Sequence, residues 1–342
     1  MTFQLAPLDP RTAPEPVLRG VHAVITAIEI EEVPQGPATT YEQQVLRLTA
    51  TPPPHLAVSR RIALDGDSVV GYSMCQTWPQ QDPDNSFVQI MVHPDHRRNG
   101  IGTALLTDVV EQLISDGRGK IIIDCVDGWP IQVKLEGLGL RNSLSTKRSR
   151  LETADIDVEL MDSWISRAQE RADDYEMFFV DAPIPVEILD EWARVKSAIN
   201  DEPFEDLEFE FTAMTPERWR SHERFAAERG EKLLACAARH IPSGSIAGTT
   251  IVYLQKHMED YAIQGDTAVE ASHRNRGLGR LVKAAMAKRI VTEYPAVRMI
   301  DTQNAGSNDA MLGINIEMGF RPFVTINAWQ GETKAVLENL SE

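Results

Sequence analysis

A glycine-rich pattern that occurs twice is the strongest constraint on what this chain can fold into. Arg-x-x-Gly-x-Gly stands at residues 97–102 and again at residues 274–279, a separation of 177 residues (274 − 97). Each copy follows a segment of strand character and leads into a segment with an apolar stripe at helical spacing. Because the elements around the two copies match in type and order, the sequence predicts an internally duplicated protein.

The elements expected in the two halves define two α/β domains. A chain of 342 residues corresponds to roughly two domains of ~150 residues. The first half predicts strands at 2–5, 55–64, 68–77, 86–92 and 120–126, with helices at 17–30, 41–48, 100–116 and 129–138. The second half predicts helices at 186–198, 215–228, 277–294 and 310–318, with strands at 232–240, 245–254, 261–269 and 297–302. We expect domains at 1–155 and 176–342, each a mixed and mostly antiparallel sheet flanked by helices. A linker at 156–175 joins them, and residues 160–172 are a candidate helix within it.

Composition and charge exclude several classes of function. The net charge of −17 disfavours nucleic acid as a partner, because a negative field repels its phosphates. Three scattered cysteines, the lack of a leader peptide and the lack of a run of ~18 apolar residues predict a cytoplasmic protein without a membrane span. We expect a monomer or a homodimer. The pair His93 and His96 has a spacing found in metal sites but no matching third ligand, so no metal is expected. The cysteines Cys75, Cys125 and Cys236 are expected to pack in the cores.

The repeated loop has the chemistry of a phosphate site. The first turn of a helix leaves N–H groups without partners and carries partial positive charge, glycine allows a ligand to approach the backbone, and arginine adds full charge. These properties suit a pyrophosphate. Neither copy has the third glycine of the dinucleotide fingerprint or the Lys-Ser/Thr ending of a P-loop, so NAD and ATP are disfavoured.

These residues resemble the acetyl-CoA-binding motif of the GNAT acyltransferase superfamily, present here in tandem over nearly the whole chain. The second copy, followed by Asn304, Asn308, Asn315 and the closing Met318-Gly319-Phe320, resembles two-domain members of actinobacterial type, including mycothiol synthase in overall plan. The resemblance implies two GNAT-like acyl-CoA N-acyltransferase domains that use acetyl-CoA (coenzyme A).

The resemblance also implies where the cofactor is held. Main-chain groups at the end of a strand would hold the pantetheine arm and acetyl group, the loop would hold the pyrophosphate, and asparagine side chains of the second half could bind the pantetheine amides. In the second half the residues are Ala268, Val269, Arg274, Asn275, Arg276, Gly277, Leu278, Gly279, Arg280, Asn304 and Asn308. In the first half they are Met91, Val92, Arg97, Arg98, Asn99, Gly100, Ile101, Gly102 and Thr103.

The catalytic groups of the superfamily are not evident in this sequence. The strand positions where many members carry a glutamate hold Ser86 and Ile263. Tyr261, Asp266 and Glu270 are substitute candidates for the base; Glu270 is favoured, and a solvated charge at a strand end is the alternative for each.

The usual tyrosine acid is replaced in both halves. Its position is Asn315 in the second half and Leu135 in the first. Asparagine can donate a hydrogen bond but does not supply a proton, so water or another residue would protonate the leaving thiolate.

The later motifs favour catalysis in the second half. The first half has no asparagine where the second half has Asn304, although its loop is intact and both halves are expected to bind acetyl-CoA. The predicted function is acyl-CoA-dependent transfer of an acetyl group to the amine of a small molecule. Two alternatives stay open: a non-catalytic acyl-CoA-binding or regulatory protein, and a protein N-acetyltransferase, whose basic substrate tails the negative charge would attract.

Overall fold

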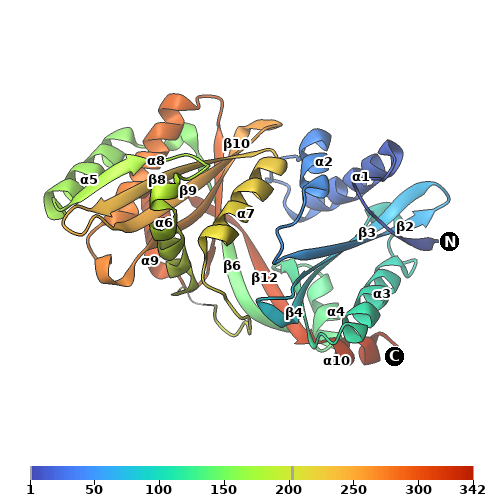
Figure 1. Cartoon of the computed structure of the whole chain (residues 1–342). Coiled ribbons are helices and arrows are strands. Elements are labelled where there is room, and N and C mark those ends of the chain that lie inside the picture. The colour runs from blue at the N-terminus through green and yellow to red at the C-terminus, as the bar shows by residue number, and fades with distance from the viewer. Residues whose placement is uncertain (1, 202–203, 342) are drawn as a thin grey trace. The chain divides into compact units, whose positions relative to one another are not determined.

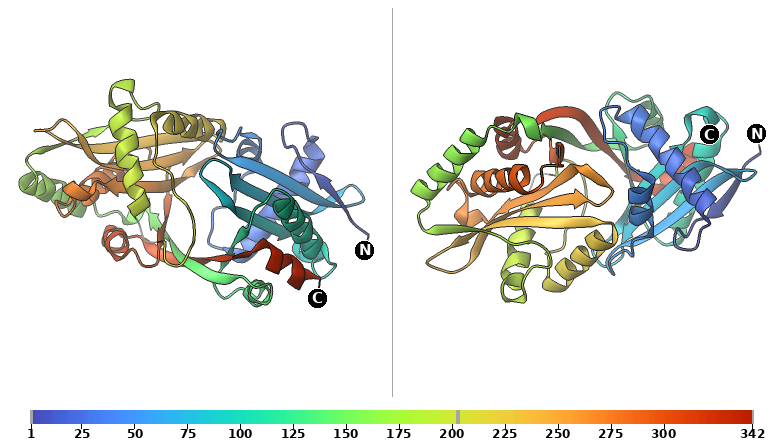
Figure 2. Two further views of the ribbon diagram at one scale, coloured as in Figure 1. Left: turned by 60° about the horizontal axis from the view of Figure 1, so that its bottom comes forward. Right: turned by 90° about the horizontal axis from the view of Figure 1, so that it is seen from above.

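The computed structural model describes residues 2–201 and 204–341, and it divides into two compact units. Unit 1 comprises Met1–Ser145, Phe204–Phe211 and Val324–Glu342. Unit 2 comprises Thr146–Pro203 and Thr212–Phe323. Each unit has one mixed sheet with helices on both faces (Figures 1 and 2).

Unit 1 has the strand order β1-β2-β3-β4-β5-β12. The strands are β1 (Gln4–Pro7), β2 (Ala57–Asp65), β3 (Ser68–Trp78), β4 (Asp82–Val92), β5 (Lys120–Val126) and β12 (Arg321–Glu332). Only the pair β4–β5 is parallel among these neighbours. The helices are α1 (Glu15–Glu32), α2 (Tyr41–Thr49), α3 (Ile101–Ser115), α4 (Ile131–Gly137) and α10 (Thr333–Leu340), with a short 3₁₀ turn, η1 (Pro94–His96), before α3.

The helices of unit 1 cover the two faces of its sheet separately. Helices α3, α4 and α10 bury apolar side chains on one face, in a core that also contains Cys75 and Cys125. Helices α1 and α2 pack on the other face, where Val21 and Val24 of α1 lie against Ile62 and Tyr72 of the sheet. The apolar stripe of each helix is thus buried, as amphipathic helices require.

Unit 2 has the strand order β6-β11-β10-β9-β8-β7. The strands are β6 (Arg141–Glu152), β7 (Tyr175–Phe179), β8 (Glu231–His240), β9 (Ile246–Gln255), β10 (Met258–Val269) and β11 (Met299–Ala305). The helices are α5 (Val158–Arg171), α6 (Leu189–Lys196), α7 (Pro216–Glu228), α8 (Leu278–Glu293) and α9 (Asp309–Met318). The 3₁₀ turns are η2 (Thr153–Asp155), η3 (Val186–Ile188), η4 (Ser197–Asp201) and η5 (Ala271–His273).

Strand β8 shows how the sheet of unit 2 serves two cores. Leu234 and Cys236 point into the core formed with α5 and α8, whereas Leu233 and Ala235 point into the core formed with α6 and α7. Successive side chains of a strand face opposite sides, so a strand buried on both faces is apolar throughout. This accounts for the continuous apolar run of β8.

The last strand of each repeat lies in the sheet of the other unit. Strand β6, which ends the first repeat, pairs antiparallel with β11 in unit 2 through residues 146–152. Strand β12, which ends the second repeat, pairs antiparallel with β5 in unit 1 through residues 326–332. The structural units therefore differ from the contiguous domains 1–155 and 176–342 of the sequence prediction. The candidate helix within the predicted linker is confirmed as α5.

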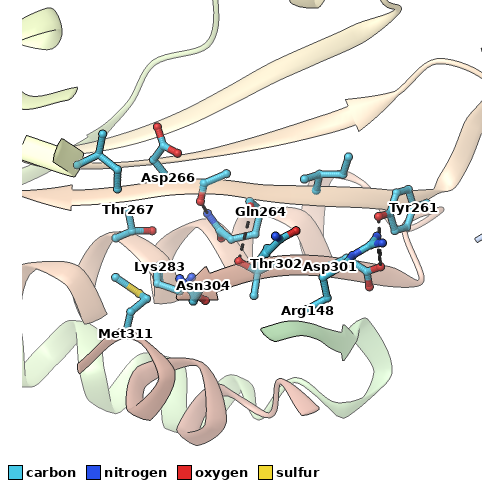
Figure 3. A pocket seen from close by; sticks show the side chains of 14 residues that line it. Arg148, Tyr261, Gln264, Asp266, Thr267, Lys283, Asp301, Thr302, Asn304 and Met311 are labelled. Atoms are coloured by element: carbon cyan, nitrogen blue, oxygen red, sulfur yellow. Dashed lines mark hydrogen bonds and ion pairs between the residues drawn. The ribbon is translucent and has the colours of Figure 1, made fainter. Parts of the chain in front are cut away.

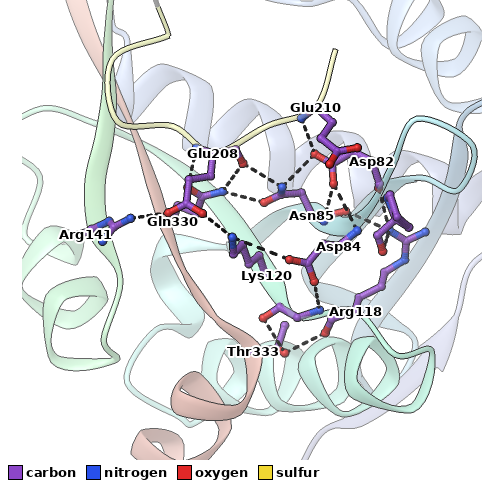
Figure 4. Close-up of polar contacts among 12 residues, drawn as sticks. Asp82, Asp84, Asn85, Arg118, Lys120, Arg141, Glu208, Glu210, Gln330 and Thr333 are labelled. Carbon is purple, nitrogen blue, oxygen red and sulfur yellow. Dashed lines mark hydrogen bonds and ion pairs between the residues drawn. The ribbon is translucent and has the colours of Figure 1, made fainter. Parts of the chain in front are cut away.

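A segment from the second half also belongs to unit 1. Residues 204–211 are held by backbone contacts with buried polar side chains (Figure 4). The backbone N–H of Glu208 donates to Gln330 Oε1 (3.0 Å), and that of Glu210 donates to Asp82 Oδ2 (2.9 Å). Asn85 Nδ2 donates to the carbonyl of Glu208 (2.9 Å). Buried polar groups of β4 and β12 are thereby satisfied, as burial demands.

Most elements expected from the sequence are confirmed, and the cysteines Cys75, Cys125 and Cys236 are buried as predicted. The sequence prediction missed β6, β7, β12 and α10. Strand β6 has the sequence RNSLSTKRSRLE, in which polar and basic residues mask any apolar alternation. Within the described residues, no helix combines the length and apolar character needed to cross a membrane.

The exchange of the final strand generates a prediction about stability. Val336 of α10 is fully buried in the core of unit 1 beside α3, so Val336→Ala should destabilise that unit by about 2 kcal/mol. Limited proteolysis should then cleave within residues 1–145 sooner than in the wild type. Lys334→Ala, on the exposed face of the same helix, is the matched control. Equal proteolysis of the two variants would show that α10 does not support unit 1.

Candidate functional site

In unit 2 the glycine-rich loop joins β10 to α8 through η5 and leaves the start of the helix open. Asn275 (φ 64°) and Gly277 (φ 83°) adopt left-handed backbone conformations, which turn the chain sharply into the helix. Gly277 precedes the first residue of α8, and no side chain caps the helix there. A side chain at position 277 would be strained, so the sequence needs glycine at this turn.

The surface of this loop is exposed and basic. Residues 274–277 are exposed, whereas Leu278 is buried beneath them and fixes the helix to the sheet. Arg274 Nε donates to the carbonyl of Val269 (3.1 Å), and Arg280 pairs with Glu317 (2.8 Å). A helix N-terminus with exposed N–H groups and adjacent guanidinium groups attracts anions such as phosphate.

Beside the loop, β10 and β11 separate and enclose a cavity (Figure 3). The two parallel strands pair only from Tyr261 to Ile263, opposite 299–301, and diverge beyond that point. The cavity has a volume of about 310 Å³. Its lining comes from six elements, β6, η4, β10, α8, β11 and α9: Arg148, Ile199, Tyr261, Ile263, Gln264, Gly265, Asp266, Thr267, Lys283, Asp301, Thr302, Gln303, Asn304 and Met311.

A bulge in β10 forms part of the cavity wall. Gln264 pairs with Val252 and Thr267 pairs with Thr250, so β10 has one more residue than β9 across this interval. Such a bulge leaves backbone groups unpaired and redirects side chains. Here it turns Asp266 outward, and Gln264 Nε2 donates to the carbonyl of Ile251 (2.8 Å), which stabilises the bulge. The sequence analysis did not predict the bulge, because bulges have no clear sequence signal.

One end of the cavity carries a buried charge cluster. Asp301 accepts two hydrogen bonds from Arg150 (2.7 and 2.9 Å) and one from the Tyr261 hydroxyl (3.2 Å). Burial, followed by the charge of Asp301, raises the pKa of Tyr261 to about 12. Tyr261 therefore stays protonated near neutral pH and is a donor, not a base.

Asp266 lies at the other end of the cavity and faces a buried cation. Lys196 Nζ, on α6, lies 2.8 Å from Asp266 Oδ2, and the lysine side chain is 1% exposed. The charge of Lys196 lowers the pKa of Asp266, so the carboxylate is ionised near neutral pH. Of the three candidate bases from the sequence, Asp266 and Tyr261 line the cavity.

The favoured catalytic residues of the sequence analysis occupy different surroundings. Glu270 forms an ion pair with Arg194 of α6 and is not among the residues that line the cavity. Asn315, on α9, is 1% exposed; its Nδ2 donates to Asn304 Oδ1 (2.7 Å), and Asn304 lines the cavity. The Oδ1 atom of Asn315 is buried without a partner among the described residues. Asn308 instead caps α9 by accepting from the N–H of Met311 (3.2 Å).

Lys283 is a cavity residue that sequence reasoning missed. It lies on α8, is 2% exposed, and makes no hydrogen bond or ion pair that the described residues supply. Its ammonium lies 5.5 Å from the centre of the Phe320 ring. Burial lowers the pKa of Lys283 to about 7. The signal was present in the repeat, because position 283 corresponds to Leu106 (283 − 177), a core leucine of α3.

Unit 1 has the same loop but a different neighbourhood. Arg98 (φ 63°) and Gly100 (φ 80°) repeat the left-handed turn before α3, which also starts without a side-chain cap. Arg97, however, forms a two-point ion pair with Glu31 of α1 (2.9 and 2.5 Å). Strand β4 pairs with β3 in unbroken register from residue 86 to 92, so it has no bulge where β10 has one.

Several of the remaining residues that the sequence predicts to bind the cofactor lie in these two loops or in the first turn of the helix that follows. Ile101 is buried like Leu278, Asn99 Nδ2 donates to the carbonyls of residues 96 and 97, and Thr103 Oγ1 accepts from Lys134 Nζ (3.1 Å). Arg276 lies 3.7 Å from Asp174. Their binding of a cofactor stays a prediction. The described residues contain no group of three or more metal-ligating side chains.

Comparison with known proteins identifies the class of fold. Residues 22–128 match the model of the Acetyltransferase (GNAT) family. The structure is similar to the tandem GNAT protein from the clavulanic acid biosynthesis pathway, with a TM-score of 0.79, 22% identity and coverage of 97% of this chain and 99% of that one. It is also similar to a GCN5-related N-acetyltransferase from Sphaerobacter thermophilus (TM-score 0.68, 15% identity, 97% and 96% coverage). No curated protein sequence matches significantly.

The chain therefore has the mixed α/β fold of tandem GNAT proteins, which confirms the fold class predicted from the sequence. GNAT acetyltransferases use acetyl-CoA, in agreement with the cofactor that the sequence resemblance implied. The fold-level likeness covers both units, whereas the family model matches part of the first repeat.

Lys283 generates a prediction with a defined pH dependence. Its pKa of about 7 in the folded protein lies below the 10.5 of an unperturbed lysine, so the unfolded chain binds more protons between these pH values. Stability of the wild type should therefore rise with pH across this interval. Lys283→Met should raise the melting temperature at pH 7 and flatten this rise, because the amine is removed. Calorimetry over the pH range tests this, and an unchanged slope would contradict it.

Proposed function

We propose that the protein is an N-acetyltransferase that moves the acetyl group of acetyl-CoA to the amine of a small molecule, with unit 2 as the active unit. The observation that carries the proposal is the adjacency, within unit 2, of an uncapped helix N-terminus and a cavity between diverging strands. The first suits a pyrophosphate and the second suits an extended arm and its acyl group. The actinobacterial type and the plan shared with mycothiol synthase stay part of this proposal.

The residues present in unit 2 fit coenzyme A. The loop from Arg274 to Arg280 would hold the pyrophosphate, and the orphaned Oδ1 of Asn315 would accept from an amide of the pantetheine arm. Bound acetyl-CoA would supply an activated acetyl thioester. Backbone N–H groups that the bulge of β10 leaves unpaired would stabilise negative charge on an oxygen at the cavity wall.

One difference supports unit 2 over unit 1. Strand β10 has a bulge between Gln264 and Thr267, whereas β4 keeps its register with β3 from residue 86 to 92. Loop arginines pair with carboxylates in both units, Arg97 with Glu31 and Arg280 with Glu317, so this pairing does not distinguish the units. We therefore assign unit 1 a structural or cofactor-binding role.

Proton removal from the acceptor amine is assigned to Asp266. An alkyl ammonium group with a pKa near ~10 must lose a proton before it attacks a carbonyl. Both carboxylates form an ion pair, Asp266 with Lys196 and Glu270 with Arg194, but only Asp266 lines the cavity. Its negative charge would also attract a cationic amine.

The first experiment tests cofactor binding and the choice of unit. Wild-type protein should bind acetyl-CoA in calorimetry and should release CoA thiol with at least one member of an amine panel. Gly277→Val should weaken binding by about tenfold or more, because the side chain strains the turn and blocks the N–H groups. Gly100→Val is the matched control in unit 1 and should leave turnover largely intact.

Equal loss of turnover from both glycine variants would reject unit 2 as the active unit. Binding of acetyl-CoA without CoA release for any amine would favour the non-catalytic alternative. If a basic peptide is acetylated while small amines are not, as mass spectrometry would reveal, the acceptor is a protein.

The second experiment compares the two carboxylates. Asp266→Asn should lower kcat by about 100-fold, the usual contribution of a positioned base, with little change in acetyl-CoA affinity. Glu270→Gln should have a smaller effect on kcat. The reverse order would assign the base to Glu270, which the sequence favours.

A further inference from the structure

A buried lysine occupies a place on the cofactor helix where the fold itself requires an apolar residue. Lys283 projects from the buried face of α8, between Val282 and Ala284, which are fully buried. The equivalent residue of the first repeat, Leu106, packs in the core of unit 1. A buried amine without a hydrogen-bond partner destabilises a protein, so the stability of the fold does not account for a lysine at position 283.

The amine faces the cavity of the proposed site. Lys283 lines this cavity together with Asn304 and Met311 (Figure 3). Asn304 is held by Asn315, the residue at the position where the superfamily resemblance implies a tyrosine acid. Asparagine supplies no proton. Among the described residues, the cavity thus has a buried amine, that of Lys283, without a hydrogen-bond partner. Beside it, Asn315 occupies the position where the resemblance implies a tyrosine that donates a proton.

We propose that Lys283 is the general acid of this site and that its ammonium group protonates the sulfur of the leaving coenzyme A. The inference rests on the proposed function and deepens it. The acceptor nitrogen forms a bond to the acetyl carbon, the carbon–sulfur bond breaks, and its electron pair goes to sulfur. The Nζ proton of Lys283 then passes to sulfur, which gives a free thiol and a neutral amine. The new amide nitrogen loses its proton to Asp266 or water, and Lys283 is reprotonated from solvent.

The surroundings of Lys283 suit proton exchange near neutral pH. Burial lowers its pKa to about 7, so both the ammonium and the amine are populated there. The titratable or charged groups on the elements packed around α8 include Asp266 and Tyr261 of β10, Asp301 of β11, Arg148 of β6, Cys236 of β8, Glu317 of α9 and Asp162 of α5. Asp266, Asp301, Glu317 and Asp162 are each ion-paired with another cation.

The first test measures turnover with Lys283→Met, a variant of similar volume that lacks the amine. It should bind acetyl-CoA within about threefold of the wild type, because the loop supplies most of the binding, and its kcat should fall by about 100-fold. The wild-type kcat should fall as the pH rises above the pKa of Lys283, and the variant should lose this limb. Lys288→Met, on the exposed side of the same helix, is the matched control. Unchanged kcat and pH profile in Lys283→Met would overturn the proposal.

The second test does not depend on turnover. In wild-type protein labelled with ¹³C-lysine, the Lys283 signal, assigned by its absence from Lys283→Met, should titrate near neutral pH. Its midpoint should differ between the complexes with CoA and with desulfo-CoA, because only the first places a thiol beside the amine. Identical titration in the two complexes would place Lys283 away from the sulfur and overturn the inference.

A different result would reject the underlying function instead. If neither CoA nor acetyl-CoA binds the wild type, the proposed function fails as a whole. If both bind and turnover occurs, only the behaviour of Lys283 decides the inference. Acetylation of Lys283 itself, detected by mass spectrometry, would also overturn it, because an amide nitrogen cannot act as the acid.

Discussion

The separation of β10 from β11 is the constraint on which the proposed chemistry depends. Backbone pairing between these parallel strands ends at Ile263, and the bulge that follows in β10 redirects the strand. Unpaired backbone groups in a core are costly, so a loss of pairing between central strands needs compensation. The cavity exists because two central strands give up their pairing, and its polar lining supplies replacement partners such as Gln264 and Thr302.

The two repeats use one scaffold for different local chemistry. Both have the left-handed turn, the uncapped helix and the parallel pair of central strands. Single side chains then distinguish them. In the first repeat Arg97 forms an ion pair with Glu31. In the second repeat the buried Lys283 occupies the position that Leu106 has in the first. A duplicated domain can lose function in one copy while the packing of helices on the sheet is maintained.

The exchanged strands, β6 and β12, explain why the structural units differ from the order of the two repeats along the chain. Strand β12 completes the sheet of unit 1 by pairing with β5, and α10 after it fills the core beside α3. Residues 204–211 are likewise fixed to unit 1 by Asp82, Asn85 and Gln330. Strands pair through backbone groups that every residue carries. Sequence similarity between the repeats therefore does not reveal that β5 pairs with β12, the last strand of the second repeat, and not with β6, the last strand of its own repeat.

The sequence by itself determined the repeat, the class of fold, most helices and strands, and the two loops, because glycine at positive φ and apolar periodicity are local properties of the chain. It did not determine β6, whose polar composition hides its pairing, nor β12, whose partner β5 lies far away in the sequence, nor the division into units. Only the tertiary structure brought Asp266, Lys283 and Asn304 to one cavity and placed Arg194 on Glu270. Burial and long-range contact between elements decide these environments, and such contacts leave no mark on residue spacing.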